Sequence, residues 1–171
     1  MKKFVTVFIC LLIILIAGCS DPTPQNTPPQ PKAKDTTHLT AQDNGMGISV
    51  SKEVRPMGQM IPSSKNGYDV VSILVKVENN SKSNIPVSPD FVTLKTVDGT
   101  EYKYSQGLTE NGPLGKSAFT ERTIPPDYTG GGLLLFELKK GSQVQSLTYT
   151  DEQNRNMTIK FPSSSQKQTS V

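Results

Sequence analysis

The segment that most constrains the fold is Tyr68–Asn79, which reads YDVVSILVKVEN and contains neither glycine nor proline. Four β-branched residues occupy alternate positions and share one face of an extended chain: Val71, Ile73, Val75 and Val77. This period of two predicts a β-strand. Val70 and Leu74 lie on the opposite face, so we expect part of that face to be covered as well.

Further segments repeat this alternation between clusters of Gly, Pro, Asn and Asp. The sequence predicts strands in four of them: 47–54, 91–105, 130–140 and 144–161. The second and the fourth divide into two strands around a polar turn, and no stretch shows a helical period with capping residues. About seven short strands separated by such turns are typical of an antiparallel β-sandwich. The predicted fold class is therefore all-β.

The segment 130–140 begins with three glycines, Gly130–Gly132. The Lys-Ser or Lys-Thr of a phosphate-binding loop does not follow them, so we interpret them as a strand-entry bulge or a close crossing of two backbones. Apolar residues then occupy both faces of the strand: Leu133 and Leu135 on one, and Leu134, Phe136 and Leu138 on the other. This pattern favours a central strand.

The hairpin predicted at 91–105 has Asp98-Gly99 at its turn, a pair that supplies the positive φ angles of tight turns. A two-residue loop would place Lys95 opposite Tyr102. A three-residue loop with a bulge would shift one arm by one residue and reverse its faces, so the sequence alone leaves the register open.

The connection Ser105–Tyr128 is long for a sandwich, and long connections often carry binding residues. One interpretation makes it a binding loop with an apolar contact patch of Leu108, Leu114 and Phe119. The interpretation that we favour places an additional strand at 116–123, with Phe119 in the core.

Residues 1–18 have the features of a secretion signal, since Lys2 and Lys3 precede an apolar run from Phe4 to Ile16. The run is shorter than the roughly 20 apolar residues of a membrane-spanning helix. The segment Ile16-Ala17-Gly18-Cys19 resembles a bacterial lipobox, in which a branched aliphatic and two small residues precede an obligatory cysteine. The resemblance implies cleavage before Cys19, a diacylglycerol group on its sulfur, and an anchor at the extracytoplasmic face of the bacterial cell membrane.

Residues 19–44 show no apolar periodicity and begin with a proline-rich stretch. This composition predicts that the lipidated Cys19 is followed by a flexible tether, in which His38 is a solvated residue. We expect the folded domain over residues 45–162. The Ser- and Gln-rich residues 163–171 are expected to form a disordered tail.

The charges and the few cysteines and histidines argue against several classes of function. Of 18 basic and 15 acidic side chains, Lys2 and Lys3 lie in the signal, which leaves 16 basic against 15 acidic and no basic stripe for nucleic acid. Cys10 also lies in the signal, and His38 is the only histidine. A Ser/His/Asp triad and a histidine or thiolate zinc site are therefore not expected, and we predict no cofactor and no metal.

A second resemblance covers about residues 45–162. It rests on the Val/Ile-rich strand that ends in Asn79, on F-x-x-L…DG-x-x-Y from Phe91 to Tyr102, on IPPDYTGGGLLLFEL at 124–138, and on L-x-Y-x-D from Leu147 to Asp151. These motifs resemble the immunoglobulin-like (telokin-like) domain of unknown function of Gram-positive lipoproteins, a family related in fold to a secreted mycobacterial immunogen. The resemblance implies an immunoglobulin-like sandwich and offers no catalytic residue to transfer. Pro125-Pro126-Asp127 stands where the family has a Pro-Gly turn.

We therefore predict a non-catalytic binding or interaction module in the cell envelope, and not an enzyme. Diacylglycerol on Cys19 would hold the module at the membrane, and its partner would be a protein or a cell-wall polymer. The alternative is a small-molecule or ion-binding accessory lipoprotein of a membrane transporter. That alternative predicts a preformed apolar pocket or a cluster of carboxylates.

Overall fold

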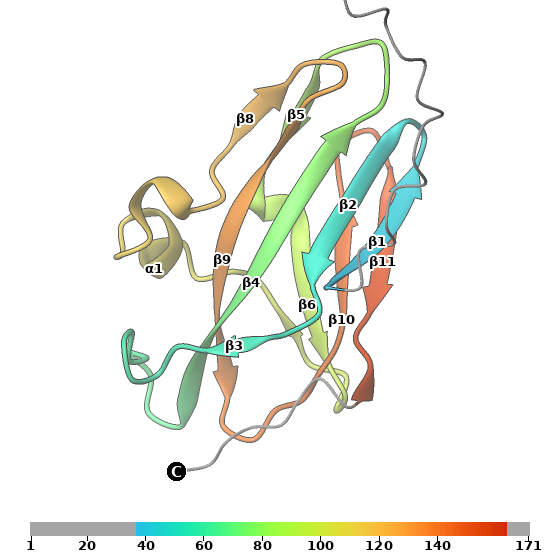
Figure 1. Cartoon of the computed structure of the whole chain (residues 1–171). Helices are drawn as coiled ribbons and strands as arrows, with labels where there is room; N and C mark the ends of the chain where they lie inside the picture. Colours follow the sequence, from blue (N-terminus) through green and yellow to red (C-terminus); the bar gives the residue numbers. More distant parts are fainter. Residues whose placement is uncertain (1–36, 164–171) are drawn as a thin grey trace, which may run out of the picture. The chain divides into compact units, whose positions relative to one another are not determined.

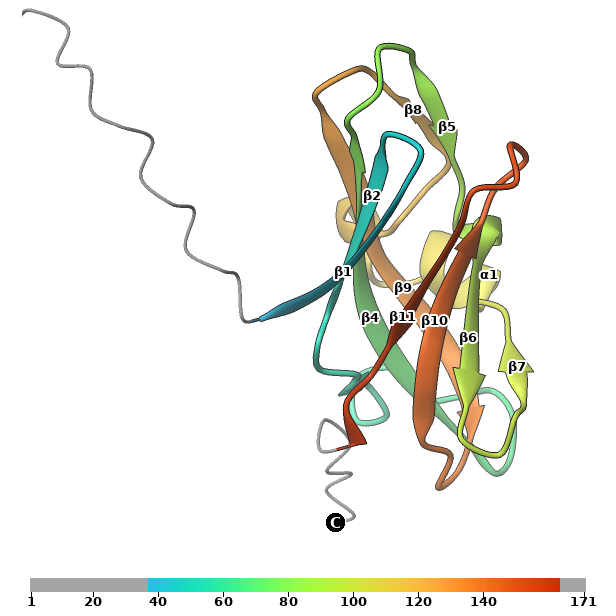
Figure 2. The same ribbon diagram turned by 90° about the vertical axis from the view of Figure 1, so that its right-hand side faces the viewer.

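Two antiparallel sheets lie face to face in the computed structural model of the chain, which describes residues 37–163 (Figures 1 and 2). The predicted signal, the lipobox, Cys19 and residues 164–171 lie outside the described residues. The predicted all-β class is confirmed, because the helical segments are short: η1 (Pro89–Phe91), α1 (Gln106–Glu110) and η2 (Gly115–Ser117). None of these helices within residues 37–163 has the length and apolar character needed to span a membrane.

The first sheet is built around β4, the long strand predicted from its alternating residues. Its strands follow the order β1 (His38–Asp43), β2 (Met46–Ser51), β4 (Tyr68–Asn79) and β9 (Thr129–Lys139), and the short β3 (Arg55–Pro56) also pairs with β4. The second sheet has the order β11 (Asn156–Lys160), β10 (Val144–Thr150), β6 (Val92–Thr96) and β7 (Glu101–Tyr102). β5 (Ile85–Val87) and β8 (Arg122–Ile124) form a separate two-stranded ribbon.

The main core lies between the two sheets. The inner faces predicted for β4 and β9 are confirmed, since their side chains are buried in one cluster: Val71, Ile73, Val75, Val77, Leu134, Phe136 and Leu138. The second sheet supplies the facing side chains: Val92, Leu94, Leu147, Tyr149, Met157 and Ile159. Burying one side chain of this size contributes roughly 1.5–3 kcal/mol, so this contact is the main source of stability.

The opposite face of β4 and β9 is covered in part, as the sequence predicts from Val70. Val70 and Leu135 are fully buried there beside Ile61. Three half-buried side chains pack against them: Met57, Leu108 and Leu114. The β3–β4 loop and the α1 segment, which lie on the outer side of β9 and β4 in Figure 1, therefore form this covering layer.

The prediction that 130–140 is a central strand is wrong. β9 pairs with β4 along one edge only. Its other edge receives hydrogen bonds from the long connection: the Ser105 amide donates to the Leu135 carbonyl at 2.7 Å, and the Phe119 amide donates to the Leu133 carbonyl at 2.9 Å. The strand is apolar on both faces because the covering layer packs on its outer face, and not because strands flank it.

The boundary predicted between tether and domain at residues 44 and 45 is also wrong, because His38–Asp43 forms β1 and pairs with β2. Leu39 and Ala41 pack against the main core. Asn44 and Gly45 have φ angles of +43° and +75°, which are the angles of a tight type I′ hairpin turn. The pair Asn44-Gly45 between alternating residues is the sequence signal for this hairpin.

The hairpin of β6 and β7 takes the register of the three-residue loop. Lys95 pairs with Glu101, one position from the partner that a two-residue loop would give it. The Thr96 amide donates to the Thr100 carbonyl at 2.9 Å, and Gly99 has a φ of +87°. A turn followed by a glycine in the left-handed region is the usual form of a three-residue hairpin loop.

The three glycines that open β9 mark a close crossing of backbones. Gly131 has a φ of +130°, and a Cβ atom there would lie 2.1 Å from the carbonyl oxygen of Val75. A Cβ atom on Gly132 would lie 2.6 Å from the amide nitrogen of Phe119. The register between β4 and β9 runs without interruption, so of the two interpretations the close crossing is confirmed and the bulge is wrong.

The additional strand predicted at 116–123 is wrong for most of its length, because Gly115–Ser117 forms η2 and the strand begins only at Arg122. β8 covers only Arg122–Ile124 and pairs with β5. Phe119 is fully buried in the main core. The competing interpretation, an exposed apolar patch of Leu108, Leu114 and Phe119, is therefore wrong for this connection.

Candidate functional site

Three loops meet at one end of the sandwich, at the upper end of Figures 1 and 2, and we call them the loop tip. They are the β1–β2 turn (44–45), the β4–β5 connection (80–84) and the β8–β9 connection (125–128). The Asn80 amide donates to the Gly45 carbonyl at 2.8 Å, and the Asp127 amide donates to the Asn79 carbonyl at 2.8 Å. Backbone hydrogen bonds thus tie all three loops to the end of β4.

Asn79, at the end of β4, holds the loop tip together from inside and is only 1% exposed. Its Nδ2 donates to the carbonyl oxygens of Ser83 at 2.7 Å and Ile124 at 2.9 Å. Its Oδ1 accepts from the amide and the hydroxyl of Ser81, at 2.9 Å and 2.6 Å. Every donor and acceptor site of the amide is therefore used, which explains why the long strand ends in this residue.

The β8–β9 connection is a turn that leaves one aromatic ring outside. The Tyr128 amide donates to the Pro125 carbonyl at 3.3 Å, and Asp127 has a φ of +63°. Pro126 followed by a residue of positive φ is the arrangement of a type II turn, in which Asp127 occupies the position that usually favours glycine. The Tyr128 side chain is 66% exposed.

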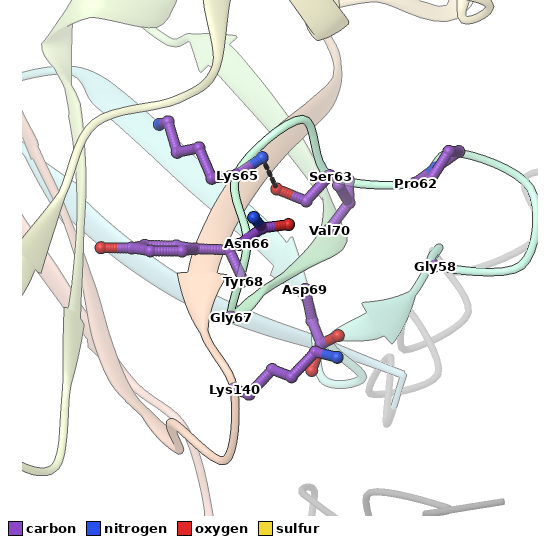
Figure 3. A pocket seen from close by; sticks show the side chains of 10 residues that line it. All are labelled: Gly58, Pro62, Ser63, Lys65, Asn66, Gly67, Tyr68, Asp69, Val70 and Lys140. Carbon is purple, nitrogen blue, oxygen red and sulfur yellow. Dashed lines mark hydrogen bonds between the residues drawn. The ribbon is translucent and has the colours of Figure 1, made fainter.

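A second candidate is a polar depression of about 260 Å³ beside the start of β4. Figure 3 shows its lining, which includes Ser63, Lys65, Asn66, Tyr68 and Lys140. The Lys65 Nζ atom lies 5.7 Å from the centre of the Tyr68 ring. A cation at this distance over an aromatic face is attracted to it, so these two residues order each other.

Glu137 of β9 binds Ser63 and Lys65, two of the residues that line this depression. Its carboxylate accepts from the Ser63 hydroxyl at 2.7 Å and pairs with Lys65 Nζ at 2.9 Å, while the Glu137 side chain is 6% exposed. Burial alone would raise the pKa of Glu137, but the hydrogen bonds from Ser63 and Lys65 and the charge of Lys65 hold it below its ordinary value. These contacts use the carboxylate to attach the β3–β4 loop to the sheet.

A buried ion pair, Asp151 with Arg155, lies in the turn between β10 and β11. The Tyr149 hydroxyl is buried near it, and burial raises the pKa of that hydroxyl. The ring of Phe91 packs edge-on against Tyr149, with 5.7 Å between ring centres. The L-x-Y-x-D motif thus occupies the interior of the sandwich and not a surface site.

The residues that the sequence singles out do not gather at one site in the described part of the chain. Cys19 and the other lipobox residues lie outside the described residues, so lipidation stays a prediction. His38 lies in β1 and is half-buried, so its prediction as a solvated tether residue is wrong. Within residues 37–163, no three His, Cys, Asp or Glu side chains gather as a metal site would require. The depression is lined mostly by polar groups and is not the apolar pocket that the transporter-accessory alternative predicts.

Residues 37–158 match the family described as "Domain of unknown function (DUF4352)". The chain belongs to the DUF4352 family. The match begins at the start of β1, which agrees with the corrected domain boundary. No curated protein matches the sequence significantly.

Solved structures share the fold of this DUF4352 domain. A "putative lipoprotein (ycdA)" from Bacillus subtilis is 22% identical, with a TM-score of 0.54 over 75% of this chain and 39% of that chain. The secreted protein MPT63 from Mycobacterium tuberculosis is 17% identical, with a TM-score of 0.51 over 73% and 92%. The yjhA protein from B. subtilis is 14% identical, with a TM-score of 0.50 over 72% and 96%.

These identities are low, so the likeness shows the fold alone. The DUF4352 domain has an MPT63-like β-sandwich fold, which confirms the predicted resemblance to a family related in fold to a secreted mycobacterial protein. The chain spans less than half the length of the ycdA chain that it matches.

Proposed function

We propose that this protein is a lipid-anchored, non-catalytic binding module on the extracytoplasmic face of a bacterial cell membrane. The observation that carries the proposal is the border at Cys19, where the lipobox Ile16-Ala17-Gly18-Cys19 ends an apolar run and a proline-rich segment begins. The likeness in fold to a "putative lipoprotein" and to a secreted protein supports this location.

The chemistry of the anchor explains why a cysteine is needed at this border. Two acyl chains on the Cys19 sulfur give stable membrane binding, whereas a single chain binds only marginally. The chain from Ser20 to residue 36 then separates the lipid from β1, and an extended proline-rich segment reaches about 3.1 Å per residue. The module would present its loops to a protein or a cell-wall polymer.

Metabolic labelling with a fatty acid tests the anchor. In cells that produce the chain, Cys19→Ser should abolish acyl labelling and leave the unprocessed precursor. The matched control is Cys10→Ser, which changes the only other cysteine and should leave labelling and processing unchanged. Normal labelling of the Cys19→Ser chain would refute the lipid anchor.

Crosslinking on living cells tests the binding role. The anchored protein should be recovered with a specific protein or wall polymer, and a chain that lacks residues 37–163 should not. Recovery of the same material by both chains would refute a binding role for the domain. The transporter-accessory alternative has no specific support from the described residues.

A further inference from the structure

We propose that residues 58–66 form a flap that opens as a unit away from the outer face of the first sheet, and that the Glu137 carboxylate holds this flap closed. The flap is the part of the β3–β4 loop between Met57 and Gly67 (Figure 1). The inference goes beyond the proposed function, because it concerns a movement within the domain and does not depend on an anchor at Cys19.

Backbone-to-backbone hydrogen bonds within the described residues connect the flap only with its own flanks. The amides of Met60 and Ile61 donate to the Met57 carbonyl at 2.8 Å and 2.7 Å. At the other end, the Tyr68 amide donates to the Lys65 carbonyl at 3.2 Å. The flap is therefore not paired with a neighbouring strand, and it can leave the sheet without breaking a ladder of hydrogen bonds.

The polar contacts of the flap with the sheet converge on one carboxylate. Glu137 accepts from the Ser63 hydroxyl at 2.7 Å and from the Ser64 hydroxyl at 3.5 Å, and it pairs with Lys65 Nζ at 2.9 Å. Hydrogen bonds to an ionised group are roughly twice as strong as those between neutral groups. The charge of Glu137 thus attaches three consecutive residues of the flap.

The flap has a single buried side chain. Ile61 is 6% exposed and packs against Val70 and Leu135, whereas the other residues of the flap are exposed or half-buried. Opening would remove Ile61 from this small cluster and leave the main core between the sheets intact. Because hydrophobic stabilisation grows with the apolar area buried, opening the flap costs far less free energy than unfolding the domain.

Both ends of the flap are fixed, and a glycine lies at each of them. The Met57 amide donates to the Val70 carbonyl at 2.8 Å, and the Gly67 carbonyl accepts from the Lys140 amide at 2.9 Å. A Cβ atom added to Gly58 or Gly67 would meet no atom within 4 Å, so neither backbone position is restricted by packing. Glycine also has the widest choice of backbone angles. These two positions can therefore act as hinges while the sheet stays paired.

Opening would uncover an apolar strip on the outer face of the first sheet. Val70 and Leu135 are fully buried there, and half-buried Leu108 and Leu114 of the long connection pack beside them. Opening would also take apart the polar depression, because half of its lining residues belong to the flap (Figure 3). The flap therefore determines whether this face of the domain presents polar or apolar groups to solvent.

Native-state hydrogen exchange of the full chain tests the proposal. The amide of buried Ile61 reports opening of the flap, and the amide of Val75, in the centre of β4, reports unfolding of the whole domain. Urea below the unfolding transition should speed exchange steeply at Val75 and only slightly at Ile61, because opening the flap exposes little surface. An equal dependence on urea at the two amides would overturn the flap.

Two variants separate opening of the flap from unfolding of the domain. Glu137→Gln removes the charge that holds the flap and should speed exchange at Ile61 about tenfold. Ile159→Val removes a methyl group from the main core, so it should speed exchange at Val75 and leave Ile61 unchanged. Equal acceleration of both amides by Ile159→Val, or no effect of Glu137→Gln at Ile61, would overturn the proposal. Exposed Glu121→Gln is the matched control and should change neither amide.

Binding of the dye anilinonaphthalene sulfonate tests whether opening uncovers the apolar strip. Glu137→Gln should bind more dye than the wild type, and Glu121→Gln should bind the same amount as the wild type. Unchanged far-ultraviolet circular dichroism in both variants would show that the domain itself stays folded. Faster exchange at Ile61 without additional dye binding would overturn the uncovered strip.

Discussion

Asp151 and Arg155 form an ion pair inside the sandwich, with 2.5 Å between Arg155 Nε and Asp151 Oδ2 and with side chains 2% and 5% exposed, respectively. Asp151 Oδ1 also accepts from the backbone amides of Gln153 and Arg155, at 2.9 Å and 3.0 Å. The same carboxylate therefore closes the β10–β11 turn and neutralises a buried guanidinium. These two roles explain in structural terms why the L-x-Y-x-D motif ends in an acidic residue, Asp151.

Removing one member of this ion pair should lower the stability of the folded protein. Asp151→Ala leaves a buried positive charge and two backbone amides without their acceptor, so we expect a loss of about 3–5 kcal/mol in the free energy of unfolding. Urea unfolding of a chain of residues 35–171 measures this free energy of unfolding. The exposed neighbour Glu152→Ala is the control and should change stability by less than about 0.5 kcal/mol. Equal losses in the two variants would contradict the role of the pair.

Asn79→Ala should loosen the loop tip. The variant leaves the buried carbonyl of Ile124 without its donor, whereas the Ser83 carbonyl still accepts from the Ser81 hydroxyl. One such buried group costs about 1–3 kcal/mol, so we expect a loss of about 1–3 kcal/mol and faster amide hydrogen exchange at Asp127 and Tyr128. Asn80→Ala, an exposed amide one residue away, is the matched control and should leave stability and exchange of these two amides unchanged.

Glu137 should make stability depend on pH in the acidic range. The pKa of Glu137 in the folded protein lies below the ordinary value of 4.5, so its stabilising effect is complete above about pH 4.5. It is lost as the pH falls through the lower, folded-state pKa. Urea midpoints from pH 7 to pH 3 should therefore fall more steeply for the wild type than for Glu137→Gln. Exposed Glu121→Gln should keep the wild-type slope, and a slope unchanged in Glu137→Gln would refute the assignment.

Gly131→Ala should disrupt the pairing of β4 and β9. The added Cβ would lie 2.1 Å from the Val75 carbonyl oxygen, on a backbone whose φ of +130° is itself unfavourable for alanine. We expect loss of the folded state or a fall in the thermal midpoint of more than about 10 °C, equivalent to several kcal/mol. Gly58→Ala meets no atom within 4 Å and should have a midpoint close to the wild-type value.

Truncation should show where the domain begins. A chain that starts at residue 45 loses β1 and exposes the edge of β2, together with core surface that Leu39 and Ala41 cover. We expect it to be less stable than a chain that starts at residue 35 and to aggregate through the uncovered strand edge. Thermal unfolding midpoints and the monomer content measured by light scattering are compared for the two chains. Equal midpoints and equal monomer content would mean that β1 is dispensable.

The strands that the sequence predicts well are those in which one face is wholly apolar. β4 is predicted to the residue because its alternation is long and uninterrupted, and the inner face of β9 follows from the same local rule. β1 was missed because it alternates Leu39 and Ala41 with polar residues on an outer strand. Its core contribution is small, and its clearest signal was the turn pair Asn44-Gly45 and not its hydrophobicity.

The candidate sites depended on contacts between residues far apart in the chain. The alternation of β4 places Asn79 on the inner face with Val77, but only the tertiary structure shows that every polar atom of its buried amide finds a partner. Glu137 lies on the outer face of β9 with Leu133 and Leu135, and only the β3–β4 loop folding over it buries the carboxylate against Ser63 and Lys65.

The sequence by itself determined the β-strand periodicity, the all-β class and the resemblance at Cys19 to a lipid-anchor site. These features depend on neighbouring residues alone: alternation along a strand, turn-forming pairs, and an apolar run that ends at one cysteine. Tertiary structure alone decided the edge position of β9, the hairpin register and the assembly of the loop tip around Asn79 and Tyr128. Those features depend on which distant backbone groups come within hydrogen-bond reach, because a buried polar group must find its partner wherever the fold brings one.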